Sequence, residues 1–315
     1  MSEILKVEHL TKEFNLEAGF FSKNKHKVYA VNDVSFNLSK GSTYGIVGES
    51  GCGKTTTSRL IIQMYKQTAG TILFNNRDVA TFNKKELKEY REKVKYIFQD
   101  PARSLNPRMT VYKILTEALK YSSQWQGKED AFNRASKIIE EVGLSKEDLN
   151  RRPAEFSGGQ RQRISIARGL IMNPELLICD EVVSALDVSI QGQILNLLQD
   201  LKKSRNLSFI FITHDLRVAC YFCDTIGVMY RGILVEEGHA QNMYKTALHP
   251  YTRLLFDGAK GETTISNQEV KTTLQKENCC PFAYRCPKAT DKCHNSLPEL
   301  KTMENGHKVR CFNCF

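Results

Sequence analysis

The segment "TYGIVGESGCGKTT", residues 43–56, constrains the fold more than any other part of the sequence. A short apolar run leads into the spacing G-x-x-x-x-G-K-[ST], which is met by Gly48, Gly53, Lys54 and Thr55. Glycines at these positions let backbone N–H groups turn inward around phosphate oxygens, and a following helix adds its positive N-terminal end. The segment therefore predicts a buried strand, a phosphate-binding loop and a helix; the alternative is an ordinary glycine-rich turn.

The side chains of this loop predict how a nucleotide is held. Lys54 is expected to reach the β- and γ-phosphates, and Thr55 is expected to ligate magnesium. The predicted cradle consists of Gly48, Glu49, Ser50, Gly51, Cys52, Gly53, Lys54, Thr55 and Thr56.

Three further apolar runs end in polar residues: "VKYIFQD" (94–100), "ELLICDE" (175–181) and "SFIFITHD" (208–215). Runs this short and rich in Ile, Leu, Val and Phe are typical of buried strands in parallel sheets. Helical patterns separate them, which predicts an open α/β sheet with right-handed crossovers. Ligands of such sheets bind beyond the carboxyl ends of the strands. We therefore expect the chemistry to converge on Gly48, Gln99, Asp180, Glu181 and His214.

The acidic pair at the end of one run predicts hydrolysis. Asp180 is expected to bind magnesium, and Glu181 is expected to orient or deprotonate a water that attacks the γ-phosphate. An isolated acidic pair is more often a strand-end or helix-capping feature, but the apolar run in front and the phosphate loop upstream disfavour that interpretation here. These residues predict binding and hydrolysis of ATP or another nucleoside triphosphate.

The stretch "EFSGGQRQRISIARGL", residues 155–170, predicts a second anion site. Apolar residues recur at helical spacing after it, so Ser157, Gly158 and Gly159 are expected to cap the start of a helix. One triphosphate needs only one cradle, and a second cradle in the same chain suggests a nucleotide held by another subunit. The alternative is a plain serine cap with a flexible approach.

Composition limits the class of protein. The chain has 10 cysteines in 315 residues and no visible signal peptide, so we expect it in a reducing cytoplasm. It has no run of about 18 apolar residues, so we expect a partner protein to carry out any step within a membrane. The formal charge of +10 is compatible with nucleic acid or an anionic membrane, but the basic residues are spread along the chain and indicate a solvated surface.

Six motifs occur in the order found in ABC transporter nucleotide-binding domains, and residues 4–237 resemble that family. The motifs are Walker A "GESGCGKT", Gln99 of "FQD", the signature "FSGGQ", Walker B "LLICDE", the D-loop "SALD" ending at Asp187, and the His214 switch. The chain departs from the family pattern at Val182, where proline is usual, and at Phe156, where leucine is usual. Neither change removes a functional group, so the resemblance implies an active site.

The resemblance implies an α/β fold of the P-loop NTPase type. An ABC nucleotide-binding domain has a RecA-like core, an antiparallel β subdomain and an α-helical subdomain, here expected at about residues 100–156 within a domain of residues 1–237. Residues 238–315 would form a small C-terminal, cysteine-rich extension. The helical subdomain would dock on a membrane permease.

The resemblance also implies roles for particular residues. Two such domains would close head to tail, so that Ser157, Gly158, Gly159 and Gln160 of one meet the nucleotide of the other, with Asp187 at the same junction. Thr55, Gln99 and Asp180 would bind magnesium, and His214 would contact the γ-phosphate. Phe14 would stack on adenine, with Tyr29 as the alternative.

More narrowly, the chain resembles oligopeptide or dipeptide permease ATPases. The resemblance rests on "SLNPRMTV" (104–111), "HPYTRLL" (249–255) and the cysteine tail, and "GFFSKNKHKVYAV" (19–31) is similar to the F-type subunit. It implies a D-type ATPase partner in a heterodimer, two transmembrane permease subunits and an extracytoplasmic solute-binding protein. The place implied is the cytoplasmic face of the cell membrane, and no nucleic acid is expected.

The tail "CCPFAYRCPKATDKC", residues 279–293, predicts a metal site rather than disulfides. It follows a polar linker (about 259–278) that cannot bury much surface, and small modules of this kind usually need a staple. Nearby basic residues, Arg285, Lys288, Lys292 and Arg310, are expected to favour thiolates.

The spacing of Cys280, Cys286, Cys293 and Cys311 resembles the pattern that holds a 4Fe-4S cluster in peptide-permease ATPases. Zinc or bare thiols are the alternatives, although the tail has a single C-x₂-C pair, Cys311 and Cys314, whereas two such pairs are typical of structural zinc sites with four cysteines. Cys279 and Cys314 are interpreted as spare thiols. The remaining four, Cys52, Cys179, Cys220 and Cys223, are expected to be small buried hydrophobes.

Other functions remain open at this point. ATPases of related importers for nickel, metal chelates or glutathione would show the same motifs. Soluble ABC ATPases that act on DNA or ribosomes usually carry two tandem domains or a long coiled coil, and this chain has one phosphate loop and no sustained heptads. The cysteine tail, taken by itself, would also be compatible with an iron–sulfur redox protein.

Overall fold

The computed structural model describes residues 2–16, 26–260, 279–304 and 306–314. It divides into two compact units, of which the first comprises residues 1–4, 39–42 and 77–212 and the second residues 5–38, 43–76 and 213–315. Residues 19–25 of the F-type segment and 261–278 of the expected linker lie outside the described residues.

The first unit contains three parallel strands in the order β8, β7, β6. They are β6 (Val94–Ile97), β7 (Leu176–Asp180) and β8 (Ser208–Thr213), with Tyr96 beside Ile178 and Ile178 beside Ile210. All residues of β7 and β8 are buried, as expected for strands covered on both faces. The three apolar runs predicted as strands are therefore confirmed.

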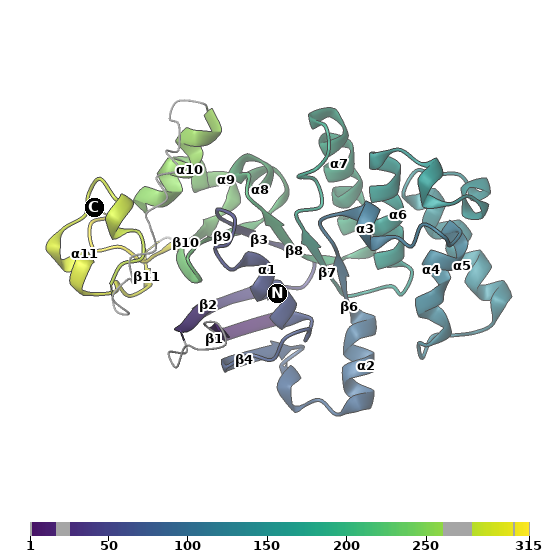
Figure 1. Cartoon of the computed structure of the whole chain (residues 1–315), viewed down its shortest axis with the longest axis horizontal. Coiled ribbons are helices and arrows are strands. Elements are labelled where there is room, and N and C mark those ends of the chain that lie inside the picture. The colour runs from purple at the N-terminus through teal and green to yellow at the C-terminus, as the bar shows by residue number, and fades with distance from the viewer. Residues whose placement is uncertain (1, 17–25, 261–278, 305, 315) are drawn as a thin grey trace, which may run out of the picture. The chain divides into compact units, whose positions relative to one another are not determined.

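Helices make up most of the rest of this unit, and α4, α5 and α6 pack against one another (Figure 1). The helix α5 covers the periodic segment "AFNRASKIIEE" and buries Ala131, Ala135, Ile138 and Ile139. The elements are β5 (Arg77–Asp78), η1 (Val79–Thr81), α2 (Lys84–Lys93), α3 (Pro101–Ser104), α4 (Val111–Lys120), α5 (Lys128–Glu141), η2 (Lys146–Asn150), η3 (Pro153–Glu155), α6 (Gly158–Leu170) and α7 (Val188–Arg205).

The second unit begins with an antiparallel sheet in the order β2, β1, β4. Its strands are β1 (Glu3–Leu16), β2 (His26–Ser39) and β4 (Ala69–Phe74), and Leu5 of β1 lies beside Phe74 of β4. In β1, Leu5 and Val7 are buried while Lys6 between them is more exposed, and Leu10, within a register shift between Glu8 and Thr11, is also buried.

The phosphate-loop strand β3 (Thr43–Val47) lies in the second unit, at one end of the strand order β11, β12, β10, β9, β3. It pairs in parallel with β9 (Thr225–Tyr230), and β9 pairs antiparallel with β10 (Ile233–His239). The strand predicted from "TYGIVG" is confirmed. The helices of this unit are α1 (Lys54–Ile61), α8 (Leu216–Phe222), α9 (Ala240–Thr246), α10 (Pro250–Lys260), η4 (Ala283–Arg285) and α11 (Asp291–Asn295).

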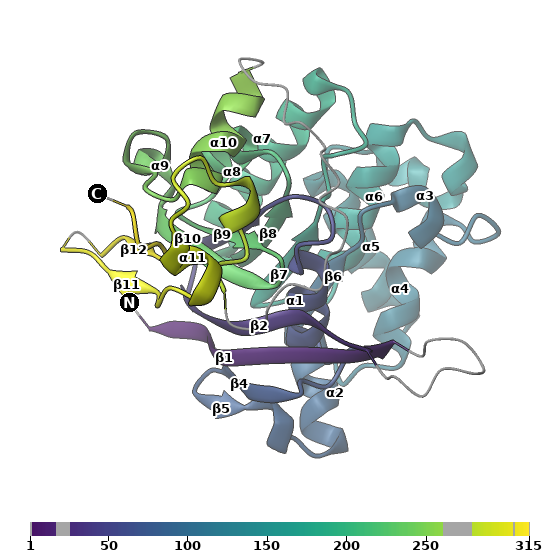
Figure 2. The same ribbon diagram turned by 60° about the vertical axis from the view of Figure 1, so that its left-hand side comes forward.

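The cysteine-bearing C-terminal segment packs on the second unit through its own strands. The strands β12 (Lys308–Val309) and β11 (Lys301–Thr302) extend the sheet beside β10, as Figure 2 shows. Phe282 and Val309 are 1% exposed. The segment therefore buries more apolar surface than its composition alone predicts, because it packs against β10 and the elements beside it.

All ten cysteines are thiols rather than disulfides. Cys52, Cys179 and Cys223 are buried as predicted, but Cys220 is only half-buried, on α8. In the part of the chain that the structure describes, no helix is both long enough and apolar enough to span a bilayer.

Candidate functional site

The residues predicted to bind and hydrolyse nucleotide divide between the two units. The second unit carries Phe14, the loop residues 48–56 and His214, and the first carries Gln99, the residues 157–160, Asp180, Glu181 and Asp187.

The loop between β3 and α1 can be formed only with glycine at particular positions. Gly51 and Gly53 have φ of 78° and 106°, a left-handed region that side chains disfavour. A Cβ on Gly48 would lie 2.3 Å from the backbone oxygen of Met229. Glycine at these positions therefore lets the loop turn closely around a ligand while remaining packed on β9.

Lys54 begins α1 and bends back over the loop. Its ammonium donates to the backbone oxygens of Gly48 (2.7 Å) and Glu49 (2.9 Å), and the side chain is 4% exposed. Cys52 lies under it, with its sulfur 4.0 Å from the Lys54 nitrogen, and burial raises the pKa of this thiol. The loop carbonyls thus already orient the cation that is expected to meet the phosphates.

The two residues predicted to meet adenine differ in their surroundings. Phe14 on β1 is half-buried, makes an edge-on contact with Tyr65 at 5.7 Å and lies under the Lys12 ammonium at 5.0 Å. Tyr29 on β2 is 42% exposed.

Asp180 ends β7 and is almost fully buried, at 4% exposure. One of its carboxylate oxygens accepts a hydrogen bond from the hydroxyl of Tyr96, on the neighbouring strand β6. Sequence reasoning missed Tyr96, because only the register of β6 against β7 brings the two side chains together.

Glu181 follows directly and is brought together with Gln99 of the same unit. The Gln99 amide donates to a Glu181 carboxylate oxygen at 2.7 Å. Glu181 has φ of 49°, in the left-handed region, and its N–H donates to the Ile212 oxygen at 3.0 Å. Backbone strain of this kind is found where a side chain must be held in one direction, often at functional sites.

Ser157 caps helix α6, as the sequence predicts. Its hydroxyl accepts from the Gln160 N–H, and the Gln160 amide oxygen accepts from the Ser157 N–H at 2.9 Å. This reciprocal pair is a capping box. Ser157 and Gly158 are exposed, so the start of the helix is open to an anion from outside the unit.

Asp187 and His214 are both exposed. Asp187 is the N-cap residue of α7, and its backbone oxygen accepts from Gln191 at 2.9 Å. His214 lies between β8 and α8.

Three of the four tail cysteines of the predicted cluster pattern share a local arrangement. In these three, the sulfur accepts a hydrogen bond from the backbone N–H of the residue two positions later in the chain. The pairs are Phe282 with Cys280, Lys288 with Cys286 and Asn313 with Cys311 (3.3 Å). The side-chain amide of Asn313 lies 3.8 Å from the Cys293 sulfur.

The surroundings of these thiols correct one expectation. Burial raises the pKa of Cys280 to about 11 and also raises those of Cys286 and Cys311, and neighbouring thiols add to each of these three shifts. Among the four basic residues expected to favour thiolates, only Lys288 lowers the pKa of one of these three thiols, that of Cys286. Arg285 and Arg310 instead bind carboxylates and backbone oxygens elsewhere.

Among the described residues, no three His, Cys, Asp or Glu side chains are already placed around a common metal position. Cys293 contributes to the raised pKa of Cys280, Cys286 and Cys311.

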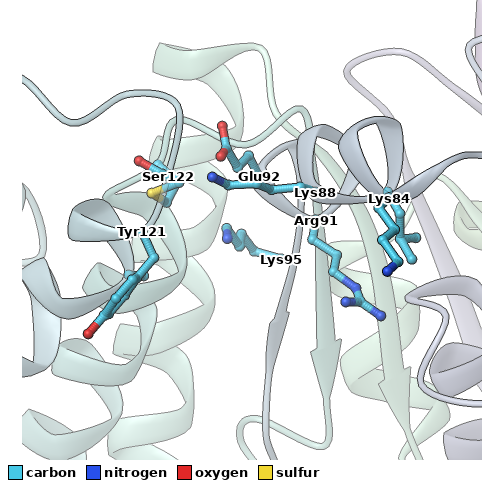
Figure 3. Close-up of a pocket in the computed structure, with 10 residues that line it drawn as sticks. Lys84, Lys88, Arg91, Glu92, Lys95, Tyr121 and Ser122 are labelled. Carbon is cyan, nitrogen blue, oxygen red and sulfur yellow. The ribbon is translucent and has the colours of Figure 1, made fainter.

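A basic groove of about 380 Å³ lies in the first unit and contains none of the predicted site residues (Figure 3). It runs along α2 to the end of α4, and burial lowers the pKa of Lys95, one of its lining residues. The carboxylate of Glu92 accepts from the Ser123 N–H and hydroxyl, at 2.8 and 2.6 Å. The groove is therefore separate from the predicted nucleotide residues.

Comparison with protein-family models gives two matches. Residues 31–184 match the ABC transporter model, and residues 235–293 match the model of the oligopeptide/dipeptide transporter C-terminal region. The first match contains the phosphate loop, Gln99, the signature residues and the acidic pair.

Two curated relatives from Bacillus subtilis are similar over most of their length. The oligopeptide transport ATP-binding protein AppF is 41% identical, over 98% of this chain and 96% of its own. The oligopeptide transport ATP-binding protein OppF is 48% identical, over 80% of this chain and 81% of its own.

Solved structures support the fold. The ATP-binding cassette MJ0796, in a dimeric post-hydrolysis state bound to ADP and phosphate, matches with a TM-score of 0.65 and 28% identity, over 75% of this chain and 98% of its own. CbiO1 from Clostridium perfringens matches with a TM-score of 0.67 and 26% identity, over 78% of this chain and 92% of its own.

The mixed α/β fold is thus that of an ABC ATPase, and the protein is an ATPase that uses ATP and Mg²⁺. The chain belongs to the family of ATP-binding subunits of oligopeptide and dipeptide ABC transporters.

Proposed function

We propose that this chain is the subunit that binds and hydrolyses ATP to power an ABC importer for peptides. It would act at the cytoplasmic face of the membrane, beside two permease subunits that receive solute from a binding protein, and pair head to tail with a second, D-type ATPase subunit. The supporting observation is the identity of 41% and 48% to two oligopeptide transport ATP-binding proteins, one of them over 98% of the chain.

The loop residues would hold the triphosphate. Backbone N–H groups of the loop would donate to phosphate oxygens, apart from those of Glu49 and Cys52, which donate to the Tyr251 hydroxyl and the Glu49 oxygen. Lys54 would exchange its two carbonyl partners for the β- and γ-phosphates. Phe14 would stack on adenine, with Tyr29 as the alternative.

Thr55, Gln99 and Asp180 would hold the magnesium ion, which neutralises charge on the phosphates when bound. These residues offer oxygen donors, the ligands magnesium prefers. The Tyr96 hydroxyl fixes one oxygen of Asp180, which keeps the buried carboxylate in one orientation.

Glu181 would act as the general base for hydrolysis. The Gln99 amide orients its carboxylate, so the proton of the attacking water has a fixed acceptor. His214 would contact the γ-phosphate. Ser157, Gly158, Gly159 and Gln160 would bind the nucleotide of the other subunit, with Asp187 beside them.

The substitution Glu181→Gln tests this assignment. The amide cannot accept the proton, so we expect ATP binding to persist and turnover to fall by about 10²-fold or more. Glu175→Gln is the matched control, because Glu175 lies before the other end of β7 and pairs with Lys93 at 3.0 Å. Equal turnover in the two variants would contradict the role of Glu181.

The transport role is tested by co-purification. The tagged chain, expressed in its native cell, is expected to carry hydrophobic permease subunits and a second ATPase. Recovery of nucleic acid or ribosomes instead would favour a soluble ABC ATPase. Transport of nickel, a metal chelate or glutathione by the purified complex, without peptide transport, would reassign the solute.

We also propose that Cys280, Cys286, Cys293 and Cys311 hold a 4Fe-4S cluster. Three of the four sulfurs accept a backbone N–H from two residues ahead, and Asn313 reaches the fourth. Hydrogen bonds of this kind support thiolates that bind an anionic cluster. Zinc is the alternative occupant, and its tetrahedral thiolate coordination would use the same four residues.

A further inference from the structure

The C-terminal segment contacts the phosphate loop directly through one ion pair. The guanidinium of Arg285, in η4, donates to both carboxylate oxygens of Glu49, at 2.8 and 2.9 Å. The two residues are 236 positions apart in the chain. Such a two-point contact fixes orientation as well as charge.

Aromatic residues hold the guanidinium in place. It lies 5.8 Å from the centres of the Tyr230 and Phe282 rings and donates to the Tyr230 hydroxyl at 3.4 Å. The side chain is 19% exposed. Arg285 is therefore a packed, half-buried cation rather than a mobile surface residue, and its ion pair is less screened than one in open solvent.

Glu49 is also held at its backbone. Its N–H donates to the hydroxyl of Tyr251, and its backbone oxygen accepts from the Lys54 ammonium, both at 2.9 Å. Tyr251 is fully buried and packs on Tyr230 at 4.6 Å. The same aromatic cluster therefore supports both Arg285 and the loop backbone.

The charge of Glu49 matters because the loop must receive a triphosphate. A carboxylate at the second position of the loop repels phosphate oxygens unless a cation neutralises it. Lys54 serves the phosphates and cannot serve Glu49 at the same time. Arg285 is the cation that the structure places against the carboxylate.

We propose that Arg285 is a positioning residue for ATP binding. By neutralising and orienting Glu49, it keeps the phosphate loop competent for nucleotide, so the C-terminal segment sets the affinity of the loop for ATP. The inference rests on the proposed function, in which this loop binds the triphosphate.

The test compares MgATP binding by the full chain and its variants. Arg285→Gln leaves the carboxylate uncompensated and is expected to weaken binding by roughly fivefold to tenfold, more at low salt than at high salt. The double variant Arg285→Gln with Glu49→Gln is expected to recover to within about threefold of wild type, because no uncompensated charge remains. Arg285→Lys keeps the charge, so its affinity for MgATP is expected to lie between those of Arg285→Gln and the double variant.

Two further variants serve as controls. Arg231→Gln removes a cation that also lies over the Tyr230 ring, at 5.7 Å, and is expected to bind like wild type. Lys54→Ala is expected to lose MgATP binding. Wild-type protein that fails to bind MgATP, or Lys54→Ala that binds equally well, would refute the proposed function rather than the role of Arg285.

The inference would be overturned by wild-type affinity in Arg285→Gln. It would also be overturned by a double variant that binds no better than Arg285→Gln, since that result indicates packing without charge compensation. In the assembled complex, the effect should appear in KM for ATP, with kcat within about twofold of wild type, because Glu181 and Gln99 are untouched.

Wild-type protein offers a measurement that needs no variant. If the Arg285 contact favours the nucleotide-bound loop, then nucleotide favours the contact by the same factor. Saturating MgATP should therefore slow amide hydrogen exchange in residues 279–295, and change it less in 301–309 of the same segment. Unchanged exchange in residues 279–295 would contradict the coupling.

Discussion

At the scale of single residues, His249 shows how burial fixes a protonation state. It is 1% exposed, and its Nδ1 accepts a hydrogen bond from the Tyr251 N–H at 3.1 Å, which requires an unprotonated nitrogen. Burial lowers the pKa of His249 to about 4, although the nearby Glu236 carboxylate opposes this shift.

This shift predicts a pH dependence of stability. Because the unfolded histidine titrates near its ordinary pKa of 6.5 and the folded one near 4, the stabilisation is complete above pH 6.5 and is lost as pH falls toward 4. Between pH 7.5 and pH 5 the loss should be about 2 kcal/mol. Urea unfolding of wild type and His249→Gln at the two pH values measures it, with the exposed His239→Gln as control. Equal pH dependence in wild type and His249→Gln would contradict the assignment.

Two contacts near the ends of β6 and β7 differ in whether the sequence predicted the residues that make them. Gln99 and Glu181 were each predicted as site residues from the polar ends of two apolar runs. Their 2.7 Å contact follows from the same rule, because the carboxyl ends of parallel strands meet at one edge. Tyr96 lies inside a run rather than at its end, and no local signal distinguished it from a core residue.

At the scale of elements, the start of α6 combines a structural and a functional task. The capping box of Ser157 and Gln160 satisfies two backbone donors within the chain. Gly158 and Gly159 leave the surface at the helix start without bulky side chains. The positive end of this helix is therefore open to an anion, as the proposed role in binding the partner's γ-phosphate requires.

The substitution Ser157→Arg tests that task. The larger cation would fill the space proposed for the partner's γ-phosphate, so we expect ATP binding by the isolated subunit to be unchanged and hydrolysis at the partner's site to fall by about 10²-fold. ATPase assays of the assembled complex measure the loss. Ser145→Arg, at another exposed capping serine of the same unit, is the control. Weakened nucleotide binding in isolated Ser157→Arg would contradict the role in trans.

At the scale of the whole molecule, the C-terminal segment is held by more than its cysteines. His307 contacts Glu236 on β10 at 2.7 Å, and Arg310 donates to the Leu234 and Pro298 backbone oxygens. Both side chains are buried. These contacts and the strand pairing anchor one half of the segment, while the other half carries the predicted cluster ligands and Arg285.

The metal content of the intact chain is the corresponding prediction. Protein purified without oxygen should be brown and contain about four iron and four sulfide per chain. Replacing Cys286 and Cys293 by serine should remove the colour and most of the iron, whereas Cys220→Ser on α8 should change neither. Colourless protein with stoichiometric zinc would show that the four cysteines bind zinc and not an iron–sulfur cluster. Protein without any metal would refute both proposals.

The sequence by itself determined the elements and chemistry that depend on neighbouring residues. The phosphate loop, the helix cap at Ser157 and the four apolar strands with their polar ends are local patterns, in which spacing along the chain decides the backbone conformation. The motif order, read as a resemblance, then led to the family that the relatives support.

Only the tertiary structure decided which distant residues meet. The contacts of Tyr96 with Asp180, of Tyr251 and Arg285 with Glu49, and of the C-terminal strands with β10 depend on strand register and packing. A positive charge beside Cys286 looked like support for a thiolate, yet its partner is a carboxylate in the phosphate loop. No pattern within one segment specifies such a partner, because the free energy of the contact belongs to two segments that meet only in the folded chain.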